Sequence, residues 1–507
     1  MVLIHVERVS LLVAKILHPT AWIDIYREVE SIPPRRLRPF LAWCLDGAYS
    51  ALAIAACASV LLGAIETYVA ALIGYIIDVL IETPPNRLFI DQWPFLLTAI
   101  GFLTFVRPAS FFLSSYFQSM VLSPGIRTMV ATRLHRWTLG HQKSYFDNDF
   151  AGRIAQKEVQ ASNAIADVTV EVISTVLFAS ASVFTSFLLL ALIDWRVGLI
   201  VAVWTFGFFL MMKFFLPRIK LHSSNRANAQ AVATGQIVDT ISNISIVKLF
   251  ANTKYEDKAA LGAFDNLKKS LQTYGKELVR FRASMVVYAS SIFLFVMAGC
   301  LFLWVHGVIS PGSVVAAGSV ALRIMMMAGW VSFSFMTIYT NLGDVQDAME
   351  TLAVPHAMID KTGASKLKVC HGRIKFDNVS YTYGSDVGGI RNVSLDIRPG
   401  EKLGVVGASG AGKSTLVSTL LRLHDPESGD IYIDGQKISD VTQNSLRRCI
   451  SMVTQETSMF NRTASENIVY GRPSASKNDV IDAAKKAGAH DFIMSLVDNQ
   501  GRTGYEA

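Results

Sequence analysis

A glycine-rich stretch near residue 410 has the residue types and spacing to hold phosphate groups. It reads Gly407-Ala408-Ser409-Gly410-Ala411-Gly412-Lys413-Ser414-Thr415, which fits the pattern of a glycine, four residues, then Gly-Lys-Ser/Thr. Glycines let the backbone turn so that its N–H groups, and the N-terminus of the next helix, face phosphate oxygens. In such a loop Lys413 reaches the β- and γ-phosphates of a nucleotide and Ser414 binds Mg²⁺. The predicted nucleotide-binding residues of the loop are Gly407, Ser409, Gly410, Gly412, Lys413, Ser414 and Thr415.

The residues on either side of the loop have the patterns of a strand and a helix. Residues Lys402–Val406 form a short apolar run typical of a buried strand, whereas Ser414–Leu423 carry apolar residues at helical spacing. A strand before the loop and a helix after it are the context that a phosphate loop requires. A glycine-rich turn that matches by chance is therefore the less favoured alternative.

The rest of the C-terminal part has the pattern of an α/β domain. Alternating residues predict strands at Arg373–Phe376 and Val393–Ile397. The run Ile431–Ile433 followed by Asp434-Gly435 predicts a strand and a turn. Another apolar run, Ile450–Val453, predicts one more strand.

The composition of the chain indicates a membrane protein. Of its 507 residues, 51% are hydrophobic and only 17% are charged, and the apolar residues form runs long enough to cross a bilayer. The net charge of +7 could suggest nucleic acid, but the basic residues lie largely between and after the apolar runs, as expected from membrane topology. We therefore expect no nucleic-acid partner.

The five cysteines are scattered and indicate neither a disulfide framework nor a metal site.

Six membrane spans are predicted, at about 48–81, 93–118, 165–193, 197–216, 284–308 and 313–340. The connections 119–164 and 217–283 are long and basic, whereas the others are short and nearly free of lysine and arginine. This places the N-terminal segment, the two long loops and the phosphate loop in the cytoplasm. The first 16 residues contain no cleavage site and are expected to stay at the membrane surface, and the lack of a mitochondrial-type presequence favours a bacterial inner membrane.

Three ionisable residues fall inside the predicted spans, namely Glu66, Arg107 and Arg323. Such residues usually face a partner or a water-filled cavity and often mark a transport path. The alternative is that Glu66 lies near an interface and that the arginines extend to the lipid headgroups. Both interpretations remain open at this point.

The cytosolic motifs, in their order, resemble those of ABC exporters, in which six membrane spans precede a nucleotide-binding domain. The motifs are Phe376–Tyr383, the phosphate loop, Ser428–Gly435 and Val453–Glu456. The resemblance implies an all-α membrane domain followed by a truncated α/β P-loop NTPase domain. The implied parts are a cytoplasmic segment (1–45), a six-helix transmembrane domain (46–342), a linker (343–371) and a partial nucleotide-binding domain (372–507).

The resemblance also implies roles for residues outside the loop. Tyr383 would stack on adenine, for which a tyrosine ring is suited. Gln455 would act in catalysis by positioning Mg²⁺ and the attacking water, which a neutral amide can do without adding charge beside the phosphates. The stretches Tyr145–Ile154 and Ile244–Ala251 resemble coupling segments, expected to be short helices at the tips of the long loops that dock on the nucleotide-binding domains.

The implied function is ATP-driven export of an amphipathic or lipid-like solute, with ATP and Mg²⁺ as cofactors. The implied partners are membrane lipid, the cargo and a second half-transporter subunit, more readily an identical chain than a different one.

The 507 residues lack the family's signature sequence, its Asp-Glu strand and its switch histidine. Because phosphoryl transfer needs complete charge neutralisation and a positioned water, we expect this chain alone to have no ATPase activity, and to expose apolar surface beside Val405 and Val406.

A second hypothesis belongs to a different class, a regulatory or decoy membrane subunit that binds nucleotide without transport. The genomic DNA beyond codon 507 distinguishes the two hypotheses. A continuing reading frame with the missing motifs supports the exporter, and a stop codon supports the regulatory subunit.

Overall fold

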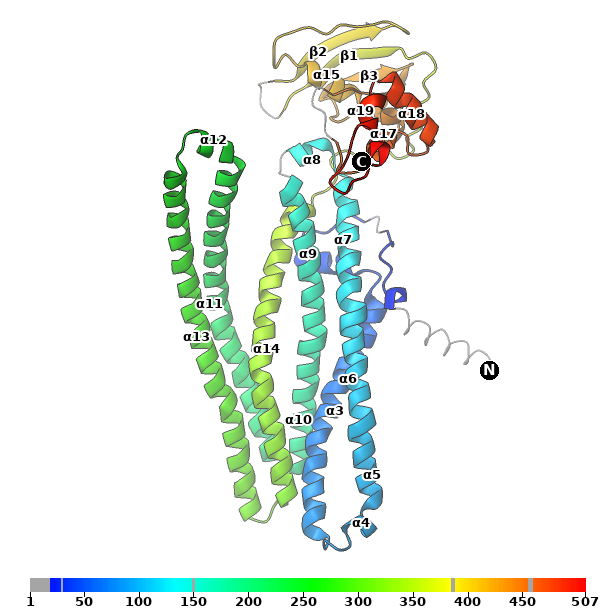
Figure 1. Ribbon diagram of the computed structural model, residues 1–507. Helices are drawn as coiled ribbons and strands as arrows, with labels where there is room; N and C mark the ends of the chain where they lie inside the picture. The colour runs from blue at the N-terminus through cyan, green and yellow to red at the C-terminus, as the bar shows by residue number, and fades with distance from the viewer. Residues whose placement is uncertain (1–18, 29–30, 148–150, 384–387, 455–458) are drawn as a thin grey trace, which may run out of the picture. The chain divides into compact units, whose positions relative to one another are not determined.

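The computed structural model describes residues 19–28, 31–147, 151–383, 388–454 and 459–507 (Figure 1). The chain forms two compact units, which divide between Met358 and Ile359. The first consists of helices, and the second contains a small sheet with short helices. Each unit is described by itself below.

The described part of the first unit contains six helical segments long and apolar enough to cross a membrane, as the sequence predicts. They are Tyr49–Glu82, Trp93–Leu139, Gly152–Ile193, Trp195–Ser242, Thr253–Val305 and Pro311–Leu352. The elements within them are α3 (Tyr49–Glu82), α5 (Trp93–Gly101), η2 (Phe102–Val106), α6 (Arg107–Tyr116), η3 (Phe117–Leu122), α7 (Ser123–Leu139), α9 (Ala151–Glu171), η4 (Val172–Leu177), α10 (Phe178–Ile193), α11 (Trp195–Ser242), α13 (Thr253–Val305) and α14 (Pro311–Leu352). Shorter elements are η1 (Pro19–Ala21), α2 (Leu37–Leu45), α4 (Leu88–Asp91), α8 (Lys143–Asp147) and α12 (Ile244–Leu249).

Two π-helical segments of the second span stand directly before prolines. The segment η2 precedes Arg107-Pro108, and η3 precedes Ser123-Pro124. Proline cannot donate a backbone hydrogen bond to the preceding turn, and a wider π turn accommodates the mismatch without ending the helix. The span therefore continues through both prolines.

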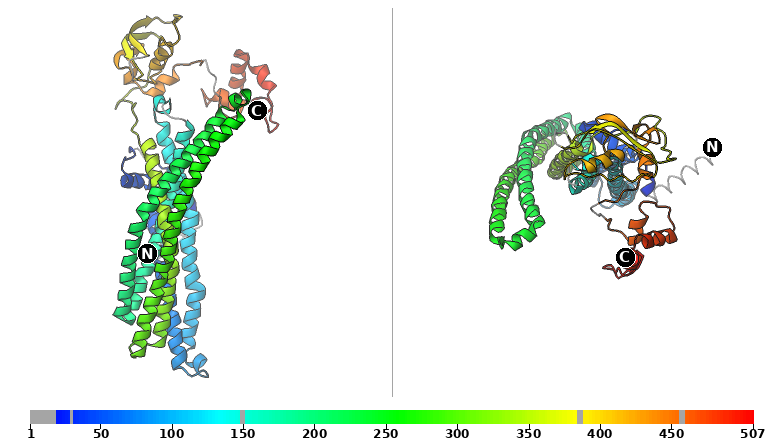
Figure 2. Two further views of the ribbon diagram at one scale, coloured as in Figure 1. Left: turned by 90° about the vertical axis from the view of Figure 1, so that its left-hand side faces the viewer. Right: turned by 90° about the horizontal axis from the view of Figure 1, so that it is seen from above.

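The helix α14 is the centre of the first unit. More than half of its most apolar window is buried, a larger share than in any other described span. Its last turns join a core that includes Phe40, Leu134 and Ile165, and its middle joins a second core with residues of α10, α11 and α13. The helices α11 and α13 run side by side to α12, where they lie apart from α7 and α9 (Figures 1 and 2). The helix α14 continues to Leu352, into the range predicted as linker.

The second unit contains an antiparallel sheet of β1 (Ile374–Tyr381), β2 (Ile390–Ile397), β3 (Ser428–Ile433) and β4 (Gln436–Lys437), in the order β2-β1-β3-β4 within the described part. Phe376 pairs with Leu395 on one side and Ile431 on the other. These residues form a core with Leu446 and Val379. The helices are α15 (Lys413–Leu420), η5 (Ile438–Asp440), α16 (Gln443–Arg448), α17 (Ala464–Val469), α18 (Lys477–Lys486), α19 (His490–Met494) and η6 (Gly504–Glu506).

The turn predicted at Asp434-Gly435 is confirmed. Both residues have positive φ angles, 47° and 76°, as a two-residue hairpin turn requires, and they join β3 to β4.

Two strand predictions are wrong. Neither Lys402–Val406 nor Ile450–Val453 is a strand, and the side chains of Val406 and Val453 are 95% and 98% exposed. An apolar run forms a buried strand only when other strands pair with it on both sides, and no strand in the described chain pairs with either run. The exposed apolar surface expected beside Val405 and Val406 is present.

Candidate functional site

The phosphate loop is held between the start of β2 and the helix α15. Gly410 and Gly412 have φ angles of 83° and 88°, in the left-handed region that favours glycine. A Cβ atom at Gly412 would collide with the carbonyl oxygen of Gly389 and lie 2.9 Å from the side chain of Ile390. The loop therefore approaches β2 so closely that only glycine fits at position 412.

The ammonium group of Lys413 lies across its own loop. Its Nζ donates to the carbonyl oxygens of Gly407, at 2.8 Å, and Ala408, at 2.7 Å. Ser414 is exposed in the first turn of α15, whereas Thr415 is buried. The predicted phosphate-binding cation and the predicted Mg²⁺ ligand are thus neighbours at the N-terminus of one helix, where the helix dipole favours anions.

Tyr383 lies beside the phosphate loop. The Thr415 hydroxyl donates to the Tyr383 hydroxyl at 3.5 Å. The Tyr383 side chain is half-exposed, and its ring meets the ring edges of Tyr381 and His424 at centroid distances of 5.1 and 5.6 Å. Tyr381 and His424 contact the Tyr383 ring, and about half of the side chain stays exposed. A base can therefore stack on this ring while the neighbouring loop holds the phosphates.

His424 is a neighbour of this site that the sequence does not predict. Its Nδ1 lies 3.0 Å from the Tyr381 hydroxyl, and the two rings stack at 4.9 Å. The order Leu423-His424-Asp425 after an expected helix gives no signal for this contact, because the pairing depends on how β1 packs on the turn after α15.

Gln455 lies outside the described residues. In the described part of the chain, no group of three or more His, Cys, Asp and Glu side chains could hold a metal ion. Of the two predicted Mg²⁺ ligands, Ser414 and Gln455, the structure describes Ser414, whose hydroxyl is an oxygen ligand of the kind that Mg²⁺ binds together with nucleotide phosphates.

The three ionisable residues of the predicted spans meet in the membrane unit. Arg107 donates to Glu66 through two nitrogens, with Nε–Oε1 at 2.7 Å and Nη2–Oε2 at 3.3 Å. Arg323 Nη1 lies 3.7 Å from Glu66 Oε2. The side chains of Glu66 and Arg323 are about one fifth exposed, and that of Arg107 about half. The three residues thus lie together and link α3, α6 and α14, whereas a role in a transport path stays a prediction.

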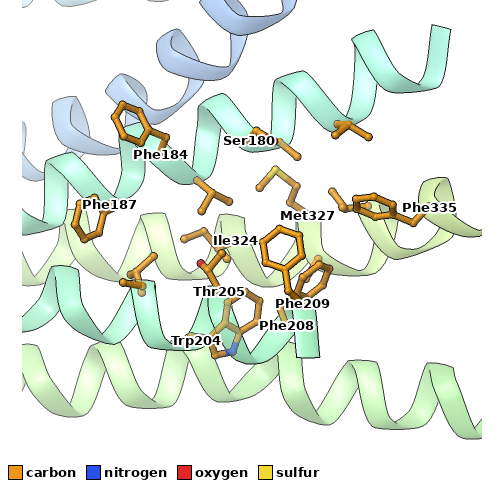
Figure 3. A pocket seen from close by; sticks show the side chains of 17 residues that line it. Ser180, Phe184, Phe187, Trp204, Thr205, Phe208, Phe209, Ile324, Met327 and Phe335 are labelled. Carbon is orange, nitrogen blue, oxygen red and sulfur yellow. The ribbon is translucent and has the colours of Figure 1, made fainter. Parts of the chain in front are cut away.

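An apolar cavity of about 480 Å³ lies between α10, α11 and α14 (Figure 3). Aliphatic and aromatic side chains form most of its wall, and the Thr205 hydroxyl is buried there without a hydrogen-bond partner among the described residues. The labelled lining residues are Ser180, Phe184, Phe187, Trp204, Thr205, Phe208, Phe209, Ile324, Met327 and Phe335. Such a wall suits the apolar part of a ligand.

The two stretches predicted as coupling segments contain short helices, as expected. The helix α12 (Ile244–Leu249) joins α11 to α13 and is followed by Phe250, whose side chain is 67% exposed. The helix α8 (Lys143–Asp147) covers the first part of the other stretch, whose residues 148–150 lie outside the described range.

Comparisons with known proteins agree with this geometry. The family model described as ABC transporter transmembrane region matches residues 52–329, and the model described as ABC transporter matches residues 390–504. An uncharacterized ABC transporter ATP-binding protein of Haemophilus influenzae is 33% identical over 485 residues, which cover 94% of this chain and 77% of that protein.

Other relatives match over a shorter region. The mitochondrial iron-sulfur clusters transporter ATM1 of Chaetomium globosum is 34% identical over 51% of this chain. Human ATP-binding cassette sub-family B member 6 is 34% identical over 53% of this chain. The matched regions cover only 43% and 32% of these two relatives.

The fold has a counterpart among solved structures. A bacterial Atm1-family ABC exporter with ATP bound matches 91% of this chain and 80% of its own chain, with a TM-score of 0.74 and 21% sequence identity. With one family model over the spans, another over the phosphate loop and a relative that covers nearly the whole chain, the protein belongs to the ABC transporters and has the fold of an exporter.

Proposed function

We propose that this protein exports an amphipathic or lipid-like solute across a bacterial inner membrane, driven by ATP. The observation that carries the proposal is that Thr415 contacts Tyr383 beside Lys413. The described part of the other unit has six candidate spans. Tyr383 would hold the base, and the loop with Lys413 would hold the phosphates. Ser414 and Gln455 would hold Mg²⁺, which would neutralise phosphate charge.

The apolar cavity supports the choice of cargo. Its wall is aromatic and aliphatic, with the Thr205 hydroxyl as a polar group that lacks a partner in the described structure. Some relatives are named as iron-sulfur clusters transporters. None of the described residues that line this cavity is a Cys, His, Asp or Glu that could ligate iron. A hydrophobic or amphipathic molecule therefore fits this cavity better.

The partner we propose is a second copy of this chain. The tip of the α11–α13 hairpin carries exposed apolar side chains, among them Ile241, Leu249 and Phe250, which are 63%, 79% and 67% exposed. Exposed apolar groups of this size commonly mark contact surfaces. The docking of α8 and α12 on nucleotide-binding domains belongs to the same proposal.

Hydrolysis needs groups beyond those that bind the nucleotide. No Asp-Glu pair follows the phosphate loop in these 507 residues, so we infer that these residues by themselves bind ATP without turning it over, and that the export proposed above needs hydrolytic groups that they do not include. ATP turnover by the purified 507-residue protein would contradict this inference.

Transport by the full-length protein in inside-out vesicles tests the proposal. The assay follows ATP-dependent accumulation of a fluorescent phospholipid and of an amphipathic dye. Lys413→Ala should abolish accumulation, whereas Lys402→Ala, an exposed lysine before the loop, should leave it unchanged. Equal accumulation by wild type and Lys413→Ala would overturn the ATP-driven mechanism, and ATP-dependent accumulation of neither probe would overturn the cargo class.

A further inference from the structure

Four rings gather at the end of the membrane unit where α7 and α14 stop. His356 stacks on Trp137 with centroids 3.9 Å apart and an interplanar angle of 17°, and His141 stacks on Tyr145 at 4.0 Å and 13°. The two histidine rings meet edge to face at 4.6 Å. We call Trp137, His141, Tyr145 and His356 the ring cluster. None of these residues belongs to the nucleotide site or the cavity.

The ring cluster fastens the end of α14 to α7 and α8. The last carbonyl groups of a helix have no partner within the helix. Trp137 Nε1 donates to the Leu352 carbonyl at 3.1 Å, and the Tyr145 hydroxyl donates to the Thr351 carbonyl at 3.1 Å. His356 Nε2 lies 2.9 Å from the carbonyl oxygen of Trp137. Side chains of one segment thus satisfy backbone groups of the other in both directions.

Gly140 is required for this packing. A Cβ atom at position 140 would lie 2.5 Å from His356 Cε1 and 2.9 Å from Nε2, which is closer than atoms can pack. The backbone angles of Gly140, φ −76° and ψ −10°, are open to any residue. The glycine is therefore needed for space at the His356 ring and not for its own conformation.

The histidines of the ring cluster suit apolar packing. Burial and the neighbouring His356 lower the pKa of His141 to about 4, so that its ring is neutral at physiological pH. Its Nε2 is buried and has no hydrogen-bond partner in the part of the chain that the structure describes. The unused donor or acceptor indicates that His141 is held there by ring packing.

The position of the ring cluster in the chain suggests its use. Tyr145 belongs to α8, in the first stretch that resembles a coupling segment. His356 stands just before the end of the membrane unit at Met358. The ring cluster thus ties together, within the membrane unit, two stretches that the proposed function connects to a nucleotide-binding domain. One is the linker, and the other is the coupling segment.

We propose that the ring cluster is a clamp that makes the linker and the α8 segment move as one body, and so transmits nucleotide binding to α7, α9 and α14. The proposal rests on the proposed ATP-driven function. Trp137, His141, Tyr145 and His356 are positioning residues in it, since they do not touch nucleotide or cargo. If the clamp is loosened, ATP still binds and the membrane helices no longer respond.

The test measures ATP affinity and hydrogen exchange together, on the full-length protein in lipid nanodiscs. Wild-type protein should show an exchange difference in α7, α8 and the end of α14 when ATP and Mg²⁺ are added. Gly140→Ala should keep the Kd for ATP within about twofold and reduce that difference at least fivefold. Gly343→Ala is the control, because Gly343 lies on α14 and a Cβ atom there meets nothing within 4 Å. It should behave as wild type.

A double variant separates a lost clamp from a damaged fold. His356→Ala should uncouple the protein as Gly140→Ala does, and adding Gly140→Ala to it should have no further effect, because the methyl group then has space. An unchanged exchange response in Gly140→Ala and His356→Ala, with ATP bound, would overturn the clamp alone. Failure of wild-type protein to bind ATP would overturn the proposed function and the clamp with it.

Discussion

Asp434 shows how one carboxylate can fix a loop in the second unit. Its Oδ2 accepts backbone N–H groups of Cys370, His371 and Gly372 at 2.7–3.0 Å, and its Oδ1 accepts that of Arg373 at 2.9 Å. These hydrogen bonds favour the charged form and hold the pKa of Asp434 well below its usual range. The carboxylate thus anchors the start of β1 to the turn after β3.

Replacement of Asp434 tests this anchor. Asp434→Asn should lower the thermal midpoint of the second unit at pH 7, because an amide cannot accept all four hydrogen bonds. An unfolded aspartate titrates near 3.8 and the folded one lower, so the stabilisation is complete above pH 3.8 and is lost as the pH falls below it. Hydrogen exchange of residues 370–373 during heating measures the midpoint. Asp482→Asn, at an exposed site, is the control, and equal shifts in both variants would contradict the anchor.

His141 should also make the stability of the membrane unit fall on acidification, but in a higher pH range than Asp434 does for the second unit. The pKa of His141 falls from 6.5 to about 4 in the folded protein, so the unfolded chain binds a proton first. Acidification from pH 6.5 to pH 4 should therefore lower the free energy of unfolding. Denaturant titrations in detergent at several pH values measure this slope. His141→Phe should reduce it, and a slope that persists unchanged would show that other groups cause it.

At the scale of single residues, motifs with fixed spacing were predictable and contacts across the chain were not. Gly407 to Thr415 follow from their spacing, whereas Tyr383 follows from the family resemblance of the stretch Phe376–Tyr383, and the structure brings Tyr383 to Thr415. Trp137 and His356 stand 219 positions apart, and nothing in the residues around either one indicates the other. Only the packing of α7 against the end of α14 creates their contact.

At the scale of elements, Glu66, Arg107 and Arg323 form a charged cluster, here called the joint, that connects three membrane helices. Glu66 of α3 receives two hydrogen bonds from Arg107 of α6, and Arg323 of α14 lies within ion-pair distance. In a bilayer an unpaired charge is costly, so removal of the shared carboxylate affects both arginines. Loss of Glu66 should therefore destabilise the membrane unit more than loss of either Arg107 or Arg323.

Glu66→Gln should lower the free energy of unfolding of the membrane unit by about 3 kcal/mol. The amide keeps the shape of the side chain and leaves Arg107 and Arg323 without a counter-charge. Unfolding in mixed micelles with increasing denaturing detergent measures the change. Glu82→Gln, at the exposed end of α3, should change the stability by less than about 0.5 kcal/mol. A similarly small effect of Glu66→Gln would contradict the joint.

Some sequence patterns specify a helix or strand by themselves, whereas others specify one only together with partner segments. Long apolar runs specify a span by themselves, because a helix satisfies its own backbone hydrogen bonds in lipid, and all six were found in the described residues. A short apolar run such as Lys402–Val406 specifies a strand only together with its partners, and this one remained unpaired. The π segments η2 and η3 were not predicted, although Pro108 and Pro124 are the signals that could have indicated them.

At the scale of the whole molecule, the helix hairpins define two opposite ends of the membrane unit. The helix α4 follows α3 at one end, and α12 joins α11 to α13 at the other (Figure 1). Basic residues are abundant in the long connection that contains α12 and scarce in the short one that contains α4. The charge distribution therefore predicts that α12 is cytoplasmic and that α4 faces the other side.

Cysteine labelling in intact cells tests this orientation. Phe89 in α4 and Leu249 in α12 are 76% and 79% exposed, so a cysteine at either site is open to reagents. In a variant without the five native cysteines, a membrane-impermeant maleimide should label Phe89→Cys from outside. Leu249→Cys should react only after the membrane is permeabilised. Ile292→Cys, at a fully buried position of α13, should react in neither case and serves as the control. Labelling of Leu249→Cys in intact cells would reverse the topology, and with it the proposed cytoplasmic side of the phosphate loop.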